Sequence, residues 1–207
     1  MKVLLINGSP HTNGCTATAL KEMETVFSAE SIETEWIQAG KPPIRGCLAC
    51  GACEKLGKCV FDDLVNETAP KFQAADGIVV GSPVYYASPN GNLLSFLDRL
   101  FYSTSFSKQM KVGAAVTSCR RGGNTATFDV LNKYFMISSM PVASSTYWNQ
   151  IHGFTAEDAK KDLEGLQTMR NLARNMVFLM RAIANERNVS GLPEQEHRHF
   201  TSFPDGK

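Results

Sequence analysis

Four cysteines are packed into a stretch of thirteen residues, in the pattern C-x2-C-x2-C-x5-C. Thiolates so close in sequence can converge on one metal cluster, and the first three repeat the spacing of bacterial cluster-binding segments. The fourth stands further off than in the C-x2-C-x2-C-x3-C-P form of those segments, and Val60 replaces the proline. Interleaved glycines let the backbone bend sharply and point N–H groups at sulfur, which lowers the charge cost of a thiolate-bound cluster. The four candidate metal ligands are Cys47, Cys50, Cys53 and Cys59.

Other uses of these thiols stay open from the residues alone. Six cysteines could form three disulfides, or the four could stay reduced, but their tight grouping favours metal or redox use in a reducing compartment. Structural zinc is a weaker alternative, because zinc sites usually join two separated pairs of ligands. The spacing therefore ranks a cluster first, free or disulfide-bonded thiols second and zinc third.

The composition is that of an ordinary globular chain. Of 207 residues, 43% are hydrophobic and 20% are charged, the formal net charge is +1, and no Pro-, Gly- or Ser-rich linker divides the chain. We therefore expect one domain over residues 1–207. The small net charge gives no electrostatic reason to expect nucleic acid or an anionic membrane as partner, so small or neutral partners are favoured. The first apolar run is too short for a signal peptide or a membrane span, so we expect a cytoplasmic protein.

Hydrophobic patterning predicts an alternation of strands and helices. Short apolar, β-prone runs predict strands at residues 2–7, 34–38, 77–81, 111–117 and 141–147. Helical spacing predicts helices at residues 16–29, 62–73, 91–101, 123–137 and 156–187. This alternation implies an α/β fold with a doubly wound parallel sheet, in which ligands bind outside the carboxyl ends of the strands. Residues 39–63 place the cysteines in a loop whose length is unusual in a compact domain unless it has a function.

The loop after the first strand has the composition of a phosphate cradle. It brings hydroxyl groups, a side-chain amide and free backbone N–H groups to the start of a helix, where anions bind well. It lacks the Gly-Lys-Ser/Thr ending of a P-loop and the glycine triplet of a dinucleotide fold, so NTP hydrolysis and ordinary dinucleotide binding are disfavoured. A capped strand-to-helix turn without a ligand is the plain alternative. The candidate residues are Ser9, His11, Asn13, Gly14, Cys15 and Thr16.

Two further loops follow the third and fourth predicted strands. The third-strand loop offers aromatic faces between two prolines, which suits a planar heterocycle, although tyrosines that merely pack would look alike. The fourth-strand loop combines cationic side chains with glycines, and its positive charge would stabilise an anionic reduced flavin; solvated arginines at a helix start are the alternative. The first set is Pro83, Val84, Tyr85 and Tyr86, and the second is Ser118, Arg120, Gly122 and Gly123.

Several short motifs occur in a fixed order over roughly residues 1–150. Together they resemble the NADPH-dependent FMN reductase-like superfamily and, more narrowly, its iron–sulfur flavoproteins. Each motif is weak alone, but the ordered combination is specific. The segments are Gly8-Ser9-Pro10, Asn13-Gly14, the cysteine run ending in Gly57-Lys58-Cys59 and Asp62-Asp63, Ala75-Asp76-Gly77-Ile78-Val79, Gly81-Ser82-Pro83-Val84-Tyr85, and Phe96-Leu97-Asp98-Arg99 with the Arg-Gly-Gly loop.

The resemblance implies a flavodoxin-like fold of three layers, α/β/α, with a five-stranded parallel sheet in the order 2-1-3-4-5 and the cysteine segment inserted after strand two. It also implies non-covalent FMN and a [4Fe–4S] cluster ligated by the four cysteines. By position, the first loop would hold the phosphate, the third-strand loop the isoalloxazine ring, and the fourth-strand loop would close over the other side of the ring. Relatives often carry Asn at the position of Cys15, so a contact there is assigned to its backbone N–H. A second departure is Cys119, a thiol beside the expected ring.

The activity implied by the resemblance is that of an FMN-dependent oxidoreductase. NAD(P)H would stack on the flavin and deliver hydride. Electrons would then pass in pairs to a quinone, nitro or azo acceptor, or singly through the cluster, which would favour ferredoxin over a nicotinamide donor. The alternatives are a cluster-free NAD(P)H-dependent reductase and a flavodoxin-like electron carrier without turnover. A hydrolase or phosphatase is disfavoured, because the sequence shows neither a base near Ser9 nor a Cys-x5-Arg loop.

The helix predicted at residues 156–187 carries an apolar, methionine-rich stripe. Such a stripe ordinarily packs on its own domain, but its length exceeds what the sheet can cover, so it could also form a subunit interface. The resemblance favours the same conclusion, since related flavoproteins commonly build the flavin site across subunits. We therefore expect a homodimer or homotetramer.

Overall fold

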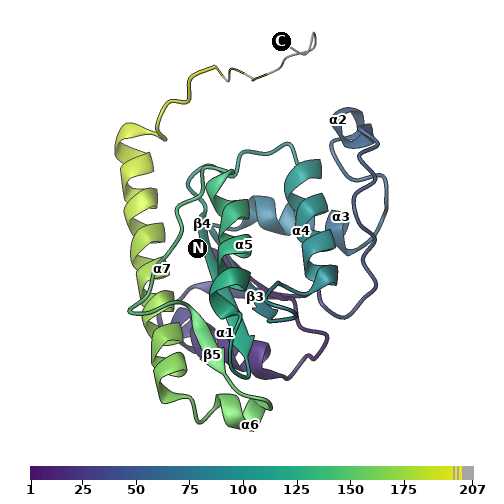
Figure 1. The fold of residues 1–207 in the computed structure, drawn as a ribbon. Helices are drawn as coiled ribbons and strands as arrows, with labels where there is room; N and C mark the ends of the chain where they lie inside the picture. The colour runs from purple at the N-terminus through teal and green to yellow at the C-terminus, as the bar shows by residue number, and fades with distance from the viewer. Residues whose placement is uncertain (198, 200, 202–207) are drawn as a thin grey trace.

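A five-stranded parallel sheet forms the centre of the molecule (Figure 1). The computed structural model describes residues 1–197, 199 and 201. The strands lie in the order β2-β1-β3-β4-β5, which confirms the predicted order, and every neighbouring pair is parallel. Their bounds are β1 Lys2–Asn7, β2 Glu33–Gln38, β3 Gly77–Pro83, β4 Val112–Cys119 and β5 Gln150–His152.

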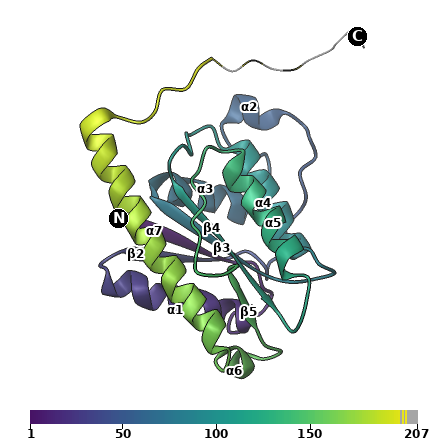
Figure 2. The same cartoon turned by 60° about the vertical axis from the view of Figure 1, so that its left-hand side comes forward.

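Helices cover both faces of this sheet and complete the predicted α/β/α layers (Figure 2). On one face, α1, α6 and α7 share a hydrophobic core with the strands, and on the other face α3, α4 and α5 share a second core. The helix bounds are α1 Cys15–Ala29, α2 Ala52–Leu56, α3 Leu64–Ala74, α4 Gly91–Ser103, α5 Asn124–Met136, α6 Ala156–Ala159 and α7 Leu163–Ser190. No helix in the described part of the chain is both long and apolar enough to span a membrane.

Neighbouring residues of β1 point into opposite cores. Val3 and Leu5 pack against the α1–α7 side, whereas Leu4 and Ile6 pack against the α3–α5 side, and all four are fully buried. A strand that is covered on both faces needs no polar side, so its sequence is a continuous apolar run rather than an alternating one. Burial of each such aliphatic side chain stabilises the folded state by about 1.5–3 kcal/mol relative to leaving it exposed.

The fifth strand lies later in the chain than the predicted residues 141–147, so that prediction was wrong. Within that range, Val142 makes an isolated parallel bridge to Gly113. The Asn149 side chain then donates to the Ala115 carbonyl at 3.1 Å, and β5 pairs with the last residues of β4. The Asn149 side chain thus bonds the middle of the outer edge of β4, where the backbone of a continuous fifth strand would otherwise have paired.

The C-terminal helical segment is interrupted, so the prediction of one helix over residues 156–187 was wrong as well. The break ends at Asp162, whose carboxylate accepts the Gly165 N–H at 2.9 Å and the His152 N–H at 2.6 Å. One side chain therefore caps α7 and ties its start to β5.

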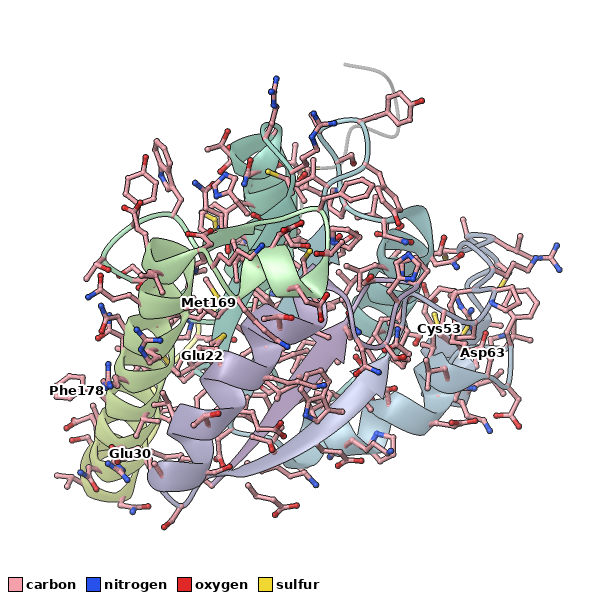
Figure 3. The ribbon with its side chains drawn as sticks, turned by 90° about the horizontal axis from the view of Figure 1, so that it is seen from below. Glu22, Glu30, Cys53, Asp63, Met169 and Phe178 are labelled. Atoms are coloured by element: carbon pink, nitrogen blue, oxygen red, sulfur yellow. The ribbon has the colours of Figure 1, made fainter. Side chains whose placement is uncertain are left out.

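The long helix α7 packs along α1, as Figure 3 shows from below. Its buried side chains include Met169 and Met176, which have no exposed surface. Ion pairs join the rims of the two helices: Arg170 pairs with Glu22, and Arg181 pairs with Glu30 at 2.9 Å. The stripe identified in the sequence therefore packs within the chain.

The insertion at residues 39–63 contains a short helix, α2, that the sequence pattern does not predict. Gly51 and Gly57 flank it, both in the left-handed region at φ +67°. In Figure 1, α2 and its loop lie at the upper right, on the side of the molecule opposite α7. The first residues of the insertion are bonded to the end of β1, whereas its cysteine-bearing part lies away from the sheet, beside α3 and α4.

Candidate functional site

A cavity of about 790 Å³ opens at the carboxyl ends of the parallel strands. Its volume falls in the range of about 300–1,000 Å³ that is typical of small-molecule sites. It also lies at the switch point of the sheet, where ligands of doubly wound folds bind. Four loops line it, with residues Ser9, Pro10, His11, Thr12, Asn13, Gly14, Cys15, Thr16, Pro83, Val84, Tyr85, Ser118, Cys119, Arg120, Gly153, Phe154, Thr155 and Ala156.

The loop after β1 is tied to buried side chains beneath it. The Ser9 N–H donates to Asn7 Oδ1 at 3.0 Å, and Ser9 Oγ accepts the His11 N–H at 3.1 Å. From the end of β2, Gln38 donates to the Ser9 carbonyl at 2.5 Å. Asn7 is fully buried. The loop is therefore pre-formed, and its shape is set by the ends of two strands.

The N-terminus of α1 forms one wall of the cavity. Its N-cap residue is Gly14, which makes no side-chain hydrogen bond to the first turn, and the first turn contains no acidic residue. The free N–H groups at a helix start carry a partial positive charge. This end of α1 therefore offers donors and positive potential to an anion, as a phosphate cradle would require.

The loop after β3 is a two-residue hairpin that presents only part of the predicted set to the cavity. Tyr85 and Ser88 exchange backbone hydrogen bonds of 2.8 and 2.9 Å, and the tip residues Tyr86 and Ala87 have φ values of +50° and +57°. Two positive φ values are what a tight hairpin requires, but they cost free energy in residues other than glycine. Tyr85 lines the cavity, whereas Tyr86 is fully exposed and lies outside the lining.

The loop after β4 likewise presents only part of its predicted residues to the cavity. Ser118 and Arg120 line the cavity, but Gly122 and Gly123 do not. Gly123 has φ +89°, and a Cβ there would come within 2.9 Å of the Val84 side chain. Its position allows this loop to pack closely against the hairpin after β3.

Two side-chain contacts join the loops across the cavity. Thr16 Oγ1 and Ser118 Oγ lie 2.8 Å apart, and both residues are buried. The Cys15 thiol donates to the carbonyls of Thr155 at 3.1 Å and Gly153 at 3.4 Å. Burial raises the pKa of Cys15, and nearby carboxylates raise it further. This side chain therefore acts as a neutral donor that connects α1 to the loop after β5.

Sequence reasoning missed the loop after β5, residues 153–156, because it placed the fifth strand too early. Phe154 stands at the cavity with 79% of its surface exposed. One signal could have located this loop. Thr155 Oγ1 accepts the Asp158 N–H at 3.2 Å, and the Asp158 carboxylate accepts the Thr155 N–H at 3.2 Å. This capping box, Thr-x-x-Asp, marks the start of α6 in the sequence itself.

Cys119, noted in the sequence as a thiol beside the expected ring, lines the cavity with 8% of its surface exposed. Its thiol donates to Asn124 Oδ1 at 3.0 Å. Burial raises the pKa of Cys119 more than this hydrogen bond lowers it. The thiol is therefore protonated near neutral pH.

The four cysteines of the insertion line a second, small cavity, which lies next to α4 and shares no residue with the large cavity. Its volume is about 20 Å³, roughly the space of one water molecule. All four thiols are free; Cys47 and Cys50 are exposed, while Cys53 and Cys59 are partly buried. Within the described residues, no three His, Cys, Asp or Glu side chains converge closely enough to hold a single metal ion. The thiols thus surround a common space without forming a preformed single-ion site.

The sequence profile of the family described as NADPH-dependent FMN reductase matches residues 1–154. The chain belongs to this family. An iron–sulfur flavoprotein of Methanocaldococcus jannaschii is 34% identical over 191 residues, which cover 88% of this chain and 99% of that protein. The iron–sulfur flavoprotein of Methanosarcina thermophila is 30% identical over 192 residues, or 91% of this chain and 100% of that protein. The predicted resemblance to FMN reductases and iron–sulfur flavoproteins is confirmed.

Solved structures agree on the fold of this FMN reductase family member. The crystal structure of RosB with a bound 8-demethyl-8-formylriboflavin-5'-phosphate intermediate superposes with a TM-score of 0.69 and covers 99% of this chain and 93% of its own. The two sequences are only 15% identical, so the likeness concerns the fold alone. It confirms the flavodoxin-like fold class.

Proposed function

We propose that this chain binds FMN in the 790 Å³ cavity. One observation carries the proposal: the uncapped, positive start of α1 lies in the wall of a cavity that is large enough for a ring system. The phosphate would accept hydrogen bonds from the backbone N–H groups of residues 13–16 and from the hydroxyls of Ser9 and Thr16. At Cys15 only the backbone would take part, because its thiol already donates to two carbonyls.

The remaining loops would hold the isoalloxazine ring. Pro83, Val84 and Tyr85 offer one apolar wall, and Ser118 and Arg120 lie on the loop that faces it. The charge of Arg120 would favour negative charge on the ring. Tyr86, Gly122 and Gly123, which the sequence also suggested, would act indirectly by shaping the hairpin and the loop that packs on it.

Bound FMN would supply hydride and electron transfer, and the protein would orient the reactants and exclude water. The chain would therefore pass electrons between a reductant, ferredoxin or NAD(P)H, and a small-molecule acceptor. The family description, an NADPH-dependent reductase, supports the oxidoreductase class.

We extend the proposal to a [4Fe–4S] cluster held by Cys47, Cys50, Cys53 and Cys59. The iron–sulfur names of the relatives support it. So does the donor set itself, since four free thiols border one space. A cluster binds each thiolate to a different iron, so its ligands need not converge on a single point as zinc ligands do.

A cluster-free NAD(P)H-dependent quinone, nitro or azo reductase is the second candidate. The small size of the cysteine cavity, about 20 Å³, favours it, because the thiols would have to move apart to admit four irons. A flavodoxin-like carrier without turnover differs from both in having no steady-state activity.

An anaerobic preparation of the full chain tests these proposals. We expect bound FMN, together with about four iron and four sulfide ions per chain after reconstitution. Replacing any one of the four cysteines by Ser should abolish iron binding and leave FMN in place, whereas the control Cys119→Ser should keep both. Flavin without iron would remove the cluster and leave the cluster-free reductase and the carrier, and the loss of flavin as well would overturn the central proposal.

Kinetics would then separate the electron partners. Steady-state oxidation of NADH or NADPH with a quinone indicates a reductase. One-electron exchange with reduced ferredoxin, without nicotinamide oxidation, indicates the cluster-linked function. Exchange without any turnover of a small molecule indicates a carrier.

We also propose that residues 1–207 act as one domain and assemble as a homodimer or homotetramer. Support comes from the outer face of α7, where Phe178 is 73% exposed beside a groove of about 380 Å³. Figure 3 shows Phe178 pointing away from the molecule.

A further inference from the structure

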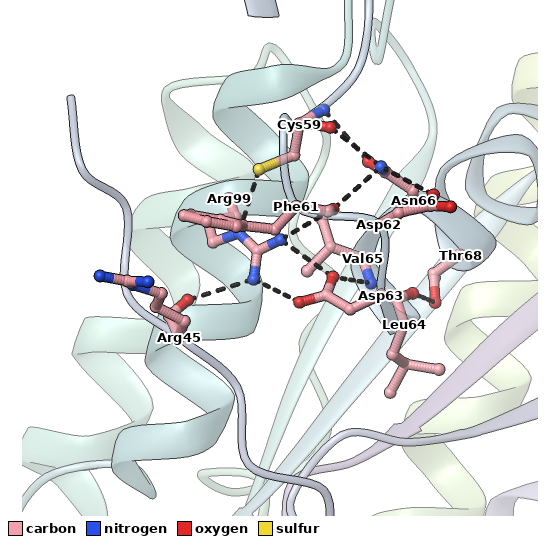
Figure 4. A network of polar contacts seen from close by, with 10 residues as sticks. All are labelled: Arg45, Cys59, Phe61, Asp62, Asp63, Leu64, Val65, Asn66, Thr68 and Arg99. Carbon is pink, nitrogen blue, oxygen red and sulfur yellow. Dashed lines mark hydrogen bonds and ion pairs between the residues drawn. The ribbon is translucent and has the colours of Figure 1, made fainter. Parts of the chain in front are cut away.

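Arg99, in α4, is almost completely buried beside the cysteine cavity, with 1% of its surface exposed. A charged side chain is rarely buried to this extent unless its charge and hydrogen-bonding groups are satisfied. The groups around it come from both the beginning and the end of the insertion, the latter leading into α3 (Figure 4).

Every N–H of the Arg99 guanidinium has an acceptor. Two donate to the Asp63 carboxylate at 2.7 and 2.9 Å, and two donate to the carbonyls of Arg45 at 3.2 Å and Phe61 at 3.3 Å. The fifth, on Nε, donates to Cys59 Sγ at 3.2 Å. A guanidinium has five N–H groups in a rigid plane. Oxygen atoms accept four of these N–H groups, and the sulfur of Cys59 accepts the fifth.

Cys59 is also fixed through its backbone. Asn66 in α3 accepts the Cys59 N–H at 3.1 Å and donates to the Cys59 carbonyl at 2.9 Å. Cys47 and Cys50, by contrast, lie exposed on the outer part of the insertion. Among the four thiols, Cys59 is thus the one attached to the body of the fold.

The charge of Arg99 is secure in this setting. The Asp63 carboxylate, which accepts two of its N–H groups, balances this buried charge. The Arg99 guanidinium also lies 5.1 Å from the centre of the Phe61 ring. The exposed Arg45 guanidinium lies at the same distance from that ring, but no hydrogen bond joins it to the sulfur in this network.

We propose that Arg99 is a positioning residue for the iron–sulfur cluster: it holds Cys59 Sγ as the fixed ligand and withdraws negative charge from that sulfur through its Nε–H. This inference rests on the proposed cluster function. Hydrogen bonds to the ligating sulfurs and nearby positive charge stabilise the more negative, reduced state of a cluster. Arg99 should therefore make the cluster both harder to lose and easier to reduce.

The test compares Arg99→Gln with the reconstituted wild-type holoprotein. We expect release of iron to a chelator to be about tenfold to a hundredfold faster in the variant, as is typical when a partner of a metal ligand is removed. We expect the equilibrium constant for one-electron reduction of the cluster to fall about tenfold, which corresponds to about 59 mV. Arg99→Lys, which keeps the charge but not the planar fork, should fall between the two.

Two control variants separate the sulfur contact from charge and from stability. Arg45→Gln removes a positive charge that is exposed, and therefore screened by solvent, and that makes no hydrogen bond to Cys59, so its potential and iron release should stay close to wild type. Asp63→Asn breaks the ion pair and weakens the fold but leaves the Nε–H to Cys59 and removes a negative charge, so its potential should stay at or above that of wild type even if the melting temperature drops. A potential that falls equally in Asp63→Asn and Arg99→Gln would overturn the inference.

The outcome also distinguishes this inference from the proposal beneath it. FMN content and the far-ultraviolet spectrum report whether each variant is folded. If wild type binds iron and Arg99→Gln matches it in iron release and potential, the role of Arg99 is overturned and the cluster stands. If wild type binds FMN but no iron, the cluster and the role of Arg99 are both overturned. If Arg99→Gln does not fold, Arg99→Lys and Asp63→Asn still decide the question by their potentials.

Discussion

At the scale of single residues, the thiols that face the large cavity differ from those of the insertion. Burial raises the pKa of both Cys15 and Cys119, and each thiol is already engaged as a hydrogen-bond donor. The thiolate is the reactive form of cysteine, so both should be poor nucleophiles near neutral pH. They are better understood as parts of the cavity wall than as redox groups, whereas Cys47 and Cys50 are exposed to solvent and reagents.

The raised pKa of Cys119 predicts a labelling profile displaced to higher pH. Alkylation of Cys119 in the folded chain should reach half its maximal rate above pH 9.0, the ordinary value for the thiol, while the same residue in urea should do so near it. The folded thiol keeps its proton at pH values at which the unfolded one has lost it. Below the pKa, the thiolate fraction and hence the labelling rate fall about tenfold for each further drop of one in pH. Mass spectrometry of the labelled peptide across pH measures both curves.

The urea-unfolded chain is the matched control, because it carries the same neighbours in sequence without the burial. Coincident curves in the folded and unfolded chains would contradict the account of Cys119 as a buried, protonated thiol. A folded curve at lower pH would reverse it and indicate an activated cysteine.

At the scale of elements, the sequence predicts what depends on local signals. The apolar runs of β1, β3 and β4 and the polar loops behind them are continuous in the chain, so their place at one edge of the sheet follows from the α/β pattern. The loop after β5 was not predicted, because the edge of β4 is completed partly by the side chain of Asn149. A contact between a side chain and a distant carbonyl leaves no periodic signal.

The same limit applies to single positions within predicted loops. Tyr86 is adjacent to Tyr85 in sequence but stands at the tip of a hairpin, since two positive φ values turn it away. Arg99 is forty residues from Cys59, and nothing in either local pattern indicates that they meet. These contacts depend on how α3, α4 and the insertion pack together, which only the structure supplies.

Packing between the insertion and the first loop gives a prediction at this scale. A Cβ at Gly40 would lie 2.2 Å from the Gly8 carbonyl oxygen and 2.4 Å from the Ser9 carbonyl carbon. Because these backbone atoms cannot move aside without distorting the loop, Gly40→Ala should shift the predicted phosphate loop. We expect it to lower stability by about 1–3 kcal/mol and to weaken FMN binding at least tenfold. Fluorescence titration with FMN and thermal unfolding measure the two effects.

Gly91 provides the control, because nothing lies within 4 Å of a Cβ built there. Gly91→Ala, at the exposed start of α4, should match wild type in FMN affinity and melt at the same or a slightly higher temperature. Equal FMN affinity in Gly40→Ala and Gly91→Ala would show that the loop after β1 does not hold the phosphate.

At the scale of the whole molecule, α4 begins near one proposed cofactor site and lines the other. It begins at Gly91, directly after the loop that carries the hairpin at the large cavity, and Arg99 faces the cysteine cavity further along. At 1.5 Å per residue, these two points of the helix are about 12 Å apart. A rigid helix that starts just after the hairpin of one proposed site and lines the other would keep the separation of the two sites constant, which suits the transfer of electrons between them.

The opposite side of the molecule gives the last prediction. The inner stripe of α7 is occupied by its packing against α1, but Phe178 on its outer face is 73% exposed, among the groove residues Arg174, Arg181 and Glu30. A large apolar side chain ringed by charges of both signs suits a self-complementary contact between two copies of the chain.

Light scattering after gel filtration should give wild type the mass of a dimer or tetramer, and Phe178→Asp should reduce that mass. Val189, 82% exposed near the end of the same helix, is the control, because Val189→Asp adds the same charge outside the groove and should leave the mass unchanged. A wild-type mass equal to that of one chain, or an equal loss of mass in both variants, would remove α7 as the interface.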